Sequence, residues 1–335
     1  MFISENLIQF KKLFAQQLKN MLSPDELGAF ILVLANAQQD ESLKAILANA
    51  LQQNFVELKQ KYDAGSLQAT DDDRLVFQRL LQMDLDALPV WSSRQVAKWQ
   101  VFYNAIRALR PARVSSERLN SIKSEFDNNK FHFNKAFLKP EILWQGEYEG
   151  ISLRVLYNKF PFAPYHLIVV ASPESAQAQY LTKELHHYIF TLVMNSQHAL
   201  PGLAMGYNSF GAGASVNHLH FQGFIRDEPL PVESADWSHN GGDKSYPVSC
   251  MVFDSAEQSW QWIQDFHEKN QPYNILYRAG RCYLLSRAFQ GAVKLPDWLN
   301  GCGWLDLAGV MTLSNQHEFE TLSSSDIAAG LTLLA

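Results

Sequence analysis

The stretch that decides the fold is Met205-Gly-Tyr-Asn-Ser-Phe-Gly-Ala-Gly-Ala-Ser-Val-Asn-His-Leu-His-Phe-Gln-Gly-Phe-Ile225. Its second half, residues 216–225, alternates polar and apolar side chains. Such alternation is typical of a half-buried β-strand, in which successive side chains lie on opposite faces. The pattern therefore predicts that His218, His220 and Gln222 share one face of a strand.

The first half of this stretch is a loop that combines glycines with small polar residues. Gly211 and Gly213 lie within it, between Asn208 and Ser215. Glycine tolerates positive φ and lets a ligand approach the backbone, so such a loop can turn its N–H groups toward an anion. The composition of the loop predicts a phosphate-binding site next to the histidines.

Two kinds of chemistry fit a His-x-His pair beside such a loop. A neutral imidazole can attack phosphorus and carry the group as a phosphoramidate, provided that a backbone carbonyl or His218 fixes its tautomer. The pair can equally be two metal ligands or part of a solvated face. Zinc needs further ligands, and neither Cys-x-x-Cys nor His-Glu-x-x-His occurs in the sequence. We therefore expect no metal site and no cofactor.

The run from Gly213 to Gln222, Gly-Ala-Ser-Val-Asn-His-Leu-His-Phe-Gln, resembles the signature of the histidine-triad superfamily. Its His-x-His-x-Gln form is that of the transferase branch. The longer run over residues 206–222 is most similar to the GDP-hexose phosphorylases, which act on GDP-L-galactose or GDP-D-glucose. A second run, Asn158-Lys-Phe-Pro161, is nearer to the diadenosine tetraphosphate phosphorylases.

This resemblance implies a role for each candidate residue. The middle histidine of the motif is the nucleophile, and a further histidine after the proline-rich turn at residues 159–165 lies beside it. The asparagine eight residues before that histidine contacts the ribose, and the loop holds the phosphate. The catalytic candidates are thus His220, His218, Gln222 and His166, and the nucleotide- or phosphate-binding candidates are Asn158, Asn208, Gly211, Gly213 and Ser215.

Apolar residues at three- and four-residue spacing predict that the first third of the chain is helical throughout. The expected helices lie near residues 7–18, 23–37, 43–58 and 71–81 and from Ser93 to about 109. We interpret them as a helical domain over residues 1–115, followed by a polar linker near 110–130. Three arginines close to this boundary, Arg107, Arg110 and Arg113, are interpreted as solvated rather than phosphate-binding.

Strand patterns dominate the rest of the chain. Strands are expected at residues 131–134, 142–145, 151–157, 166–171, 273–277, 281–286 and 309–313, with helices at 174–198 and 256–267 and from Ser325. The resemblance implies two similar halves, here a catalytic half at 129–230 and a degenerate second half at 231–335. The predicted fold class is α+β: an antiparallel, HIT-like sheet with helices, preceded by an all-helical N-terminal domain.

Composition limits the class of partner. The chain has 335 residues, 47% of them hydrophobic, and a net charge of −6 without a basic run. These values argue against nucleic acid and anionic membranes as partners. The three cysteines form no paired pattern, and the N-terminus lacks a signal-peptide pattern, so a cytoplasmic location is expected. The sequence leaves a homodimer open.

The expected function is nucleotidyl transfer from a nucleoside diphosphate sugar of the GDP-hexose kind, through a covalent nucleotidyl-histidine. Inorganic phosphate or a sugar phosphate would accept the group. Two alternatives stay open at this point: a phosphorylase of dinucleoside polyphosphates, and a non-catalytic nucleotide-binding module. Neither the base, the sugar nor the acceptor follows from the sequence.

Overall fold

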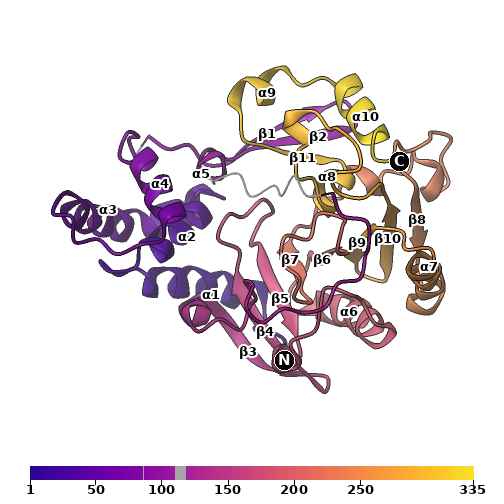
Figure 1. Ribbon diagram of the computed structural model, residues 1–335, viewed down its shortest axis with the longest axis horizontal. Helices are drawn as coiled ribbons and strands as arrows, with labels where there is room; N and C mark the ends of the chain where they lie inside the picture. Colours follow the sequence, from indigo (N-terminus) through magenta and orange to yellow (C-terminus); the bar gives the residue numbers. More distant parts are fainter. Residues whose placement is uncertain (86, 110–117) are drawn as a thin grey trace.

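The computed structural model describes residues 1–85, 87–109 and 118–335 (Figure 1). Its α-helices are α1 (Leu7–Asn20), α2 (Leu27–Ala37), α3 (Glu41–Asp63), α4 (Asp71–Leu80), α5 (Ala105–Ala108), α6 (Lys183–Asn195), α7 (Ala256–Glu268), α8 (Trp304–Leu307), α9 (Gln316–Thr321) and α10 (Ser324–Thr332). Its strands are β1 (Ser92–Val96), β2 (Trp99–Tyr103), β3 (Ile142–Tyr148), β4 (Ile151–Tyr157), β5 (Leu167–Ala171), β6 (Leu203–Asn208), β7 (Phe221–Ile225), β8 (Cys250–Phe253), β9 (Tyr273–Arg278), β10 (Arg281–Ser286) and β11 (Val310–Leu313).

One large sheet forms the centre of the molecule. Its eight strands follow the order β3-β4-β5-β7-β6-β9-β10-β8, and all neighbouring pairs are antiparallel. The sheet runs without a break from the first predicted half into the second, which meet where β6 pairs with β9. The α+β fold class predicted from the sequence is therefore confirmed. The domain boundaries stay a prediction, and the one at residue 115 lies outside the described residues.

The first face of the sheet is covered by helices. Side chains from α1 to α4 and from α6 and α7 share one apolar cluster with alternate residues of the central strands. The ring of Phe14 on α1 packs edge-on against Tyr157 and Tyr165, and the Tyr157 hydroxyl donates to the carbonyl oxygen of Phe14 (2.8 Å). The N-terminal helices are thus part of the main core, as their position beside β3 to β5 also shows (Figure 1).

The second face carries two separate apolar clusters. One covers β6, β7, β9 and β10 with the C-terminal segment, and it includes Phe224, Leu276 and Trp304. The other covers β4 and β5 and includes Leu156 and Ile168. Gln222 lies directly opposite Ile168 in the β5–β7 ladder, so it points to this second face, between the two clusters. The candidate site occupies this position.

A smaller sheet replaces the helix predicted from Ser93. β1 and β2 form an antiparallel hairpin through Ala97, whose φ is 53°, and β2 pairs in parallel with β11 from the far end of the chain. The helical interpretation was wrong because apolar residues within β2 and α5 happen to fall at helical spacing. The strand that completes this sheet lies about 200 residues further along, beyond the reach of any local pattern.

Four further predictions need correction. Residues 131–134 lie in a turn instead of a strand. Within the range 174–198, which was expected to be one helix, the α-helix is limited to α6. The strand expected over 216–225 begins only at Phe221. The helix expected from Ser23 begins at Leu27, because the Ser23 hydroxyl accepts from the Asp25 N–H without capping a helix.

None of the helices in the described ranges combines the length and apolar character that crossing a bilayer requires.

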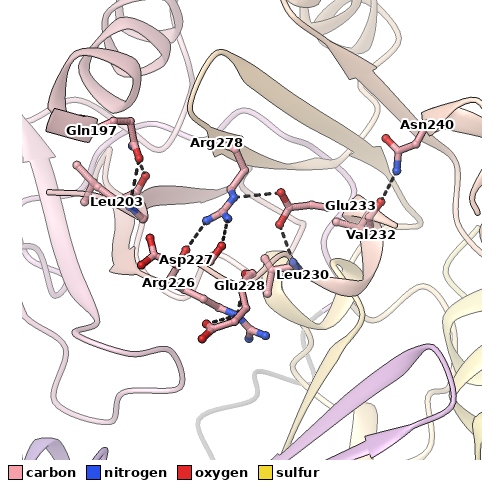
Figure 2. Close-up of polar contacts among 11 residues, drawn as sticks. Gln197, Leu203, Arg226, Asp227, Glu228, Leu230, Val232, Glu233, Asn240 and Arg278 are labelled. Carbon is pink, nitrogen blue, oxygen red and sulfur yellow. Dashed lines mark hydrogen bonds and ion pairs between the residues drawn. The ribbon is translucent and has the colours of Figure 1, made fainter. Parts of the chain in front are cut away.

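The segment that follows β7 is fixed by a half-buried ion pair. Arg278 on β9 contacts Glu233 (Nε to Oε1, 3.1 Å) and donates to the carbonyl oxygen of Arg226 (2.9 Å), as Figure 2 shows. The second Glu233 oxygen accepts from the Leu230 N–H (2.6 Å). The neighbouring Val232 N–H then donates to Ala308 (3.0 Å), which ties the end of β7 to the C-terminal segment.

That C-terminal segment reaches the second face through one close approach. The Trp304 ring stacks on Phe224 (4.9 Å between centroids, 22° between planes), and a Cβ placed on Gly206 would lie 2.2 Å from that ring. Only glycine therefore fits at this position of β6, because a methyl group would occupy the space of the indole.

Gly206→Ala should lower the free energy of unfolding by about 1–3 kcal/mol, because the added methyl displaces Trp304 from its stacking partner. A matched control is Gly223→Ala on the adjacent strand, where the nearest atom would lie at an ordinary 3.4 Å. Urea unfolding of both variants measures the difference. Equal stability of the two variants would contradict the packing described here.

Candidate active site

The loop between β6 and β7 is held at both ends by Gln179, a buried residue outside both strands. Its side-chain oxygen accepts from the His220 N–H (2.9 Å), and its Nε2 donates to the carbonyl oxygens of Asn208 (2.8 Å) and His220 (3.2 Å). One side chain thus joins the residue that ends β6 to the residue that precedes β7. The segment 209–220 between them has no regular secondary structure.

His220 is buried, and its tautomer is fixed by the chain itself. Nδ1 lies 2.7 Å from the carbonyl oxygen of His218, and because a carbonyl can only accept, Nδ1 carries the proton. Nε2 therefore carries the lone pair. Burial lowers the pKa of His220 to about 4, against the opposing effect of its hydrogen bond to His218. The ring is consequently neutral near pH 7.

His218 has the opposite tautomer. Its Nδ1 accepts from the Phe133 N–H (3.1 Å), so the proton of the neutral ring lies on Nε2. Burial, followed by the neighbouring His220, lowers the pKa of His218 to about 4. The Phe133 ring packs against both histidines, with centroids 5.8 Å from His218 and 4.9 Å from His220. Phe133 is therefore a wall of the site that the sequence analysis did not identify.

His166 stands at the head of β5 and is fully buried. Its Nδ1 accepts from the Phe162 N–H (3.2 Å), and its Nε2 lies 3.4 Å from the Asn158 side chain. Burial, followed by the charge of Arg107, lowers the pKa of His166 to about 3, while a hydrogen bond with Gln222 opposes the shift. Asn158 is itself fixed, because its side-chain oxygen accepts from the Phe160 N–H (3.0 Å).

Gln222 joins His166 to the C-terminal segment. Its side-chain oxygen accepts from the Trp304 indole N–H (2.8 Å), and the amide also interacts with His166. The Trp304 backbone N–H donates in turn to the Asn208 side chain (2.8 Å), which also accepts from Asn274 (2.6 Å). The oxygen of Asn208 therefore already has two partners, both of which position neighbouring parts of the site.

The glycines of the loop have the conformation that the sequence suggested. Gly211 and Gly213 have φ values of +82° and +93°, and a Cβ on Gly213 would lie 2.6 Å from the carbonyl oxygen of Cys302. Ser215 lies on the exposed side of the loop. None of the backbone N–H groups of residues 213–218 has a hydrogen-bond partner among the described residues. The loop thus holds a row of backbone donors beside the histidines.

The structure brings together residues that the sequence had separated. His166, His218, His220, Gln222, Asn158 and Asn208 all meet on the second face, whereas Ser215 lies at its edge. Arg107 was expected to be solvated, yet it is half-buried over the Phe162 ring (4.8 Å) and donates to Phe160 (2.9 Å). Arg110 and Arg113 lie outside the described residues. The described residues contain no group of three or more histidine, cysteine or acidic side chains placed to hold a metal ion.

Comparison with known proteins gives a family match over the region that holds the site. The GDPGP1-like, N-terminal domain family matches residues 96–224. Over these 129 residues the chain is similar to a GDPGP1-like N-terminal domain. The match begins at Val96, the last residue of β1 and earlier than the boundary at residue 129 predicted from the sequence, and it ends within β7. The GDPGP1-like domain therefore contains every candidate residue, from Asn158 to Gln222.

Relatives with a GDP-hexose phosphorylase name confirm the resemblance found in the sequence. The chain is 26% identical over 256 residues to GDP-L-galactose phosphorylase 1 of Arabidopsis thaliana, which covers 64% of the chain and 57% of that protein. It is 37% identical over 209 residues to GDP-D-glucose phosphorylase 1 of Xenopus laevis, covering 54% of the chain and 52% of the relative. The chain thus spans about half the length of these relatives.

The fold extends beyond the GDPGP1-like domain. A yeast Ap4A phosphorylase structure superposes with a TM-score of 0.51 at 15% identity, covering 80% of this chain and 95% of that one. At this identity the likeness concerns the fold alone. The matched part, 80% of the chain, is larger than the GDPGP1-like match over residues 96–224, so the similarity in fold extends beyond that region.

The buried histidines make stability depend on pH. In the unfolded chain His166 has an ordinary pKa near 6.5, whereas in the folded chain its pKa is about 3. Below about pH 6.5 a proton therefore binds the unfolded chain more tightly than the folded chain, and the free energy of unfolding decreases as the pH falls. Between pH 7 and pH 5 this histidine accounts for about 2 kcal/mol of that loss. Replacing it by glutamine, which does not titrate, should make the fall smaller by that amount in urea unfolding at the two pH values. A variant that loses as much stability as the wild type would contradict this assignment.

Proposed function

We propose that the protein is a nucleotidyltransferase that transfers a nucleoside monophosphate from a nucleoside diphosphate sugar, of the GDP-hexose kind, to inorganic phosphate or a sugar phosphate. The observation that carries this proposal is the state of His220: a neutral imidazole whose lone pair is on Nε2, held beside a loop whose N–H groups over residues 213–218 have no partner among the described residues. The names of the relatives support the same class of substrate.

The first half-reaction uses His220 as the nucleophile. Nε2 attacks the α-phosphorus, a P–N bond forms, and the P–O bond to the sugar phosphate breaks, so the sugar phosphate leaves. The imidazole becomes positively charged, and the carbonyl oxygen of His218 stabilises this charge through the Nδ1–H bond (2.7 Å). In this proposal the N–H groups of residues 213–218 stabilise negative charge on the non-bridging oxygens, because they have no backbone partner among the described residues.

The second half-reaction reverses these bonds. An oxygen of the acceptor phosphate attacks phosphorus, the P–N bond breaks, and His220 returns to its neutral form. Gln222 does not titrate near neutral pH, so it cannot deprotonate a water molecule, whereas an anionic acceptor needs no such base. Because the indole of Trp304 also holds the Gln222 oxygen (2.8 Å), this amide is positioned rather than mobile. The arrangement favours transfer over hydrolysis.

The remaining candidates have binding roles in this proposal. Asn158, which adjoins His166, contacts the nucleotide, and the Gly211–Ser215 loop holds the phosphate. Asn208 acts by positioning the loop and Trp304, because its side-chain oxygen is already shared by two donors. We further propose that the protein acts in the cytoplasm, in keeping with its unpaired cysteines.

His220→Ala should reduce phosphate-dependent release of nucleoside diphosphate from a GDP-hexose by at least about a thousandfold, because the P–N bond of the intermediate forms at its Nε2. Nucleotide affinity, measured by calorimetry, should change by only a few-fold. His187→Ala on α6, a partly exposed residue outside the site, is the matched control. Retained turnover in the His220 variant would refute the proposal.

The same assays distinguish the alternatives. A wild type that binds nucleotides without turning over any nucleotide sugar or dinucleoside polyphosphate would be a binding module. Turnover of adenine dinucleotides with none of GDP-hexoses would assign the site to the other phosphorylase class.

A further inference from the structure

The turn at residues 159–165 joins β4 to β5 and separates two candidate residues of the site. Asn158 precedes the turn and His166 follows it, and the Asn158 N–H donates to the carbonyl oxygen of His166 (3.1 Å). Their side chains also adjoin, with 3.4 Å between the amide nitrogen of Asn158 and His166 Nε2. The conformation of the turn therefore decides where both side chains lie.

The last residue of this turn has a strained backbone. Tyr165 has a φ of +50°, which is in the left-handed region. A bulky aromatic residue rarely adopts this conformation, because its Cβ approaches the following carbonyl oxygen. Such strain persists only where the surrounding structure imposes it, and it is concentrated at functional sites. Since the next residue is His166, this strained backbone sets the direction in which the histidine enters the site.

Contacts from the N-terminal helices impose this conformation. Gln39, which lies between α2 and α3, accepts a hydrogen bond from the Tyr165 N–H (2.6 Å). The Tyr165 ring packs edge-on against Phe10 and Phe14 of α1, with centroids 5.7 and 5.1 Å away. The Lys11 ammonium lies 5.3 Å from the centroid of the same ring. Both the backbone and the ring of Tyr165 are thus held from outside the turn.

The amide of Gln39 has one orientation. Its oxygen accepts from the turn, while its Nε2 donates to the carbonyl oxygen of Asn36 (3.0 Å), so neither end can exchange with the other. Asn36 is itself buried at the end of α2, and its side chain donates to the carbonyl oxygen of Asn158 (3.0 Å). The end of α2 therefore holds the residue before the turn as well as the last residue of the turn.

A third attachment comes from α4. Lys159, the first residue of the turn, forms a largely buried ion pair with Asp73 (Nζ to Oδ1, 2.5 Å). The residues that hold the turn from α2 and α4 lie within 36–73, outside the GDPGP1-like match over residues 96–224. The proposed reaction gives this part of the chain no role.

We propose that Gln39 is a positioning residue of the active site, which holds Tyr165 in the left-handed conformation and thereby fixes His166 and Asn158. The N-terminal helices are then a part of the site in functional terms, although none of their side chains takes part in the chemistry. The inference rests on the proposed function for the role of Asn158 toward the nucleotide. Its consequence for His166 can be measured without any turnover.

The tautomer of His166 reports its position. In the wild type Nδ1 accepts from the Phe162 N–H (3.2 Å), so the neutral ring carries its proton on Nε2. In Gln39→Met the Tyr165 N–H loses its acceptor, the backbone relaxes toward the extended region, and the bond to Phe162 is lost. Histidine nitrogen NMR at neutral pH should then show a mixture of both tautomers for this ring. The spectrum of His166→Gln identifies which signals belong to it.

Two further variants complete this experiment. Gln53→Met replaces an exposed glutamine of α3 whose amide contacts Glu57 (3.5 Å), and this matched control should leave the His166 signals unchanged. Gln39 is only half-buried, and Gln39→Asn, which keeps an amide but shortens its reach, should give the same change where Gln39→Met impairs folding. Unchanged His166 signals in a folded Gln39 variant overturn the proposal.

Nucleotidyl transfer should fall together with this change. In Gln39→Met we expect the rate at saturating substrate to drop by about 100-fold, because small misplacements of positioned groups have large kinetic effects. In a Tyr165→Gly background the same substitution should cost about twofold at most, because glycine adopts positive φ without an imposed contact. An equally large effect in both backgrounds overturns the proposed route through the Tyr165 backbone.

The two proposals fail in different ways. Altered His166 signals in the Gln39 variants of a protein that transfers no nucleotide would refute the proposed reaction and leave the positioning role intact. Transfer at the wild-type rate in folded Gln39 variants, with unchanged His166 signals, would refute the positioning role and leave the reaction intact.

Discussion

The hydrogen bond from His220 Nδ1 to the carbonyl oxygen of His218 is the interaction on which the site depends. A buried imidazole needs a partner for its N–H, and the backbone two residues earlier provides one without adding a charge. This geometry leaves the lone pair on Nε2, and burial keeps the ring neutral. Gln179, which bonds the backbone of His220 on both sides, holds the loop in the conformation that makes the bond possible.

The rest of the fold places this bond between two apolar clusters. The N-terminal helices and α6 and α7 bury the first face of the sheet, while the second face is divided between the C-terminal segment and the cluster over β4 and β5. Trp304 comes from the second half of the chain, yet its indole holds Gln222 and its backbone holds Asn208. The GDPGP1-like domain over residues 96–224 is therefore completed by a residue far outside it.

Local signals in the sequence predicted much of this arrangement. The alternation in β4, the apolar runs in β5 and β10 and the glycine-rich loop from Asn208 to Ser215 are properties of a few consecutive residues, so short-range physics suffices to identify them. The resemblance identified His166 and Asn158 as further site residues. They flank the turn at residues 159–165, and both lie on the second face of the sheet. Strand and helix patterns also placed α1, α3, α4 and α7 close to their observed bounds.

The remainder depends on contacts between distant parts of the chain. β1 and β2 form a sheet because β11 supplies the third strand, and the spacing of Trp99 and Phe102 alone looks helical. Gln179 belongs to no motif, since its role comes from lying between the ends of β6 and β7. Phe133 and Trp304 likewise enter the site only through tertiary packing.

The most direct test of His220 as the nucleophile is the intact mass of the protein after incubation with a GDP-hexose in phosphate-free buffer. We expect one added nucleotidyl group on His220, stable to alkali and labile to acid, which added phosphate discharges as nucleoside diphosphate. Hydrolysis of the substrate at the same rate with and without an acceptor, and no adduct at any time, would contradict it.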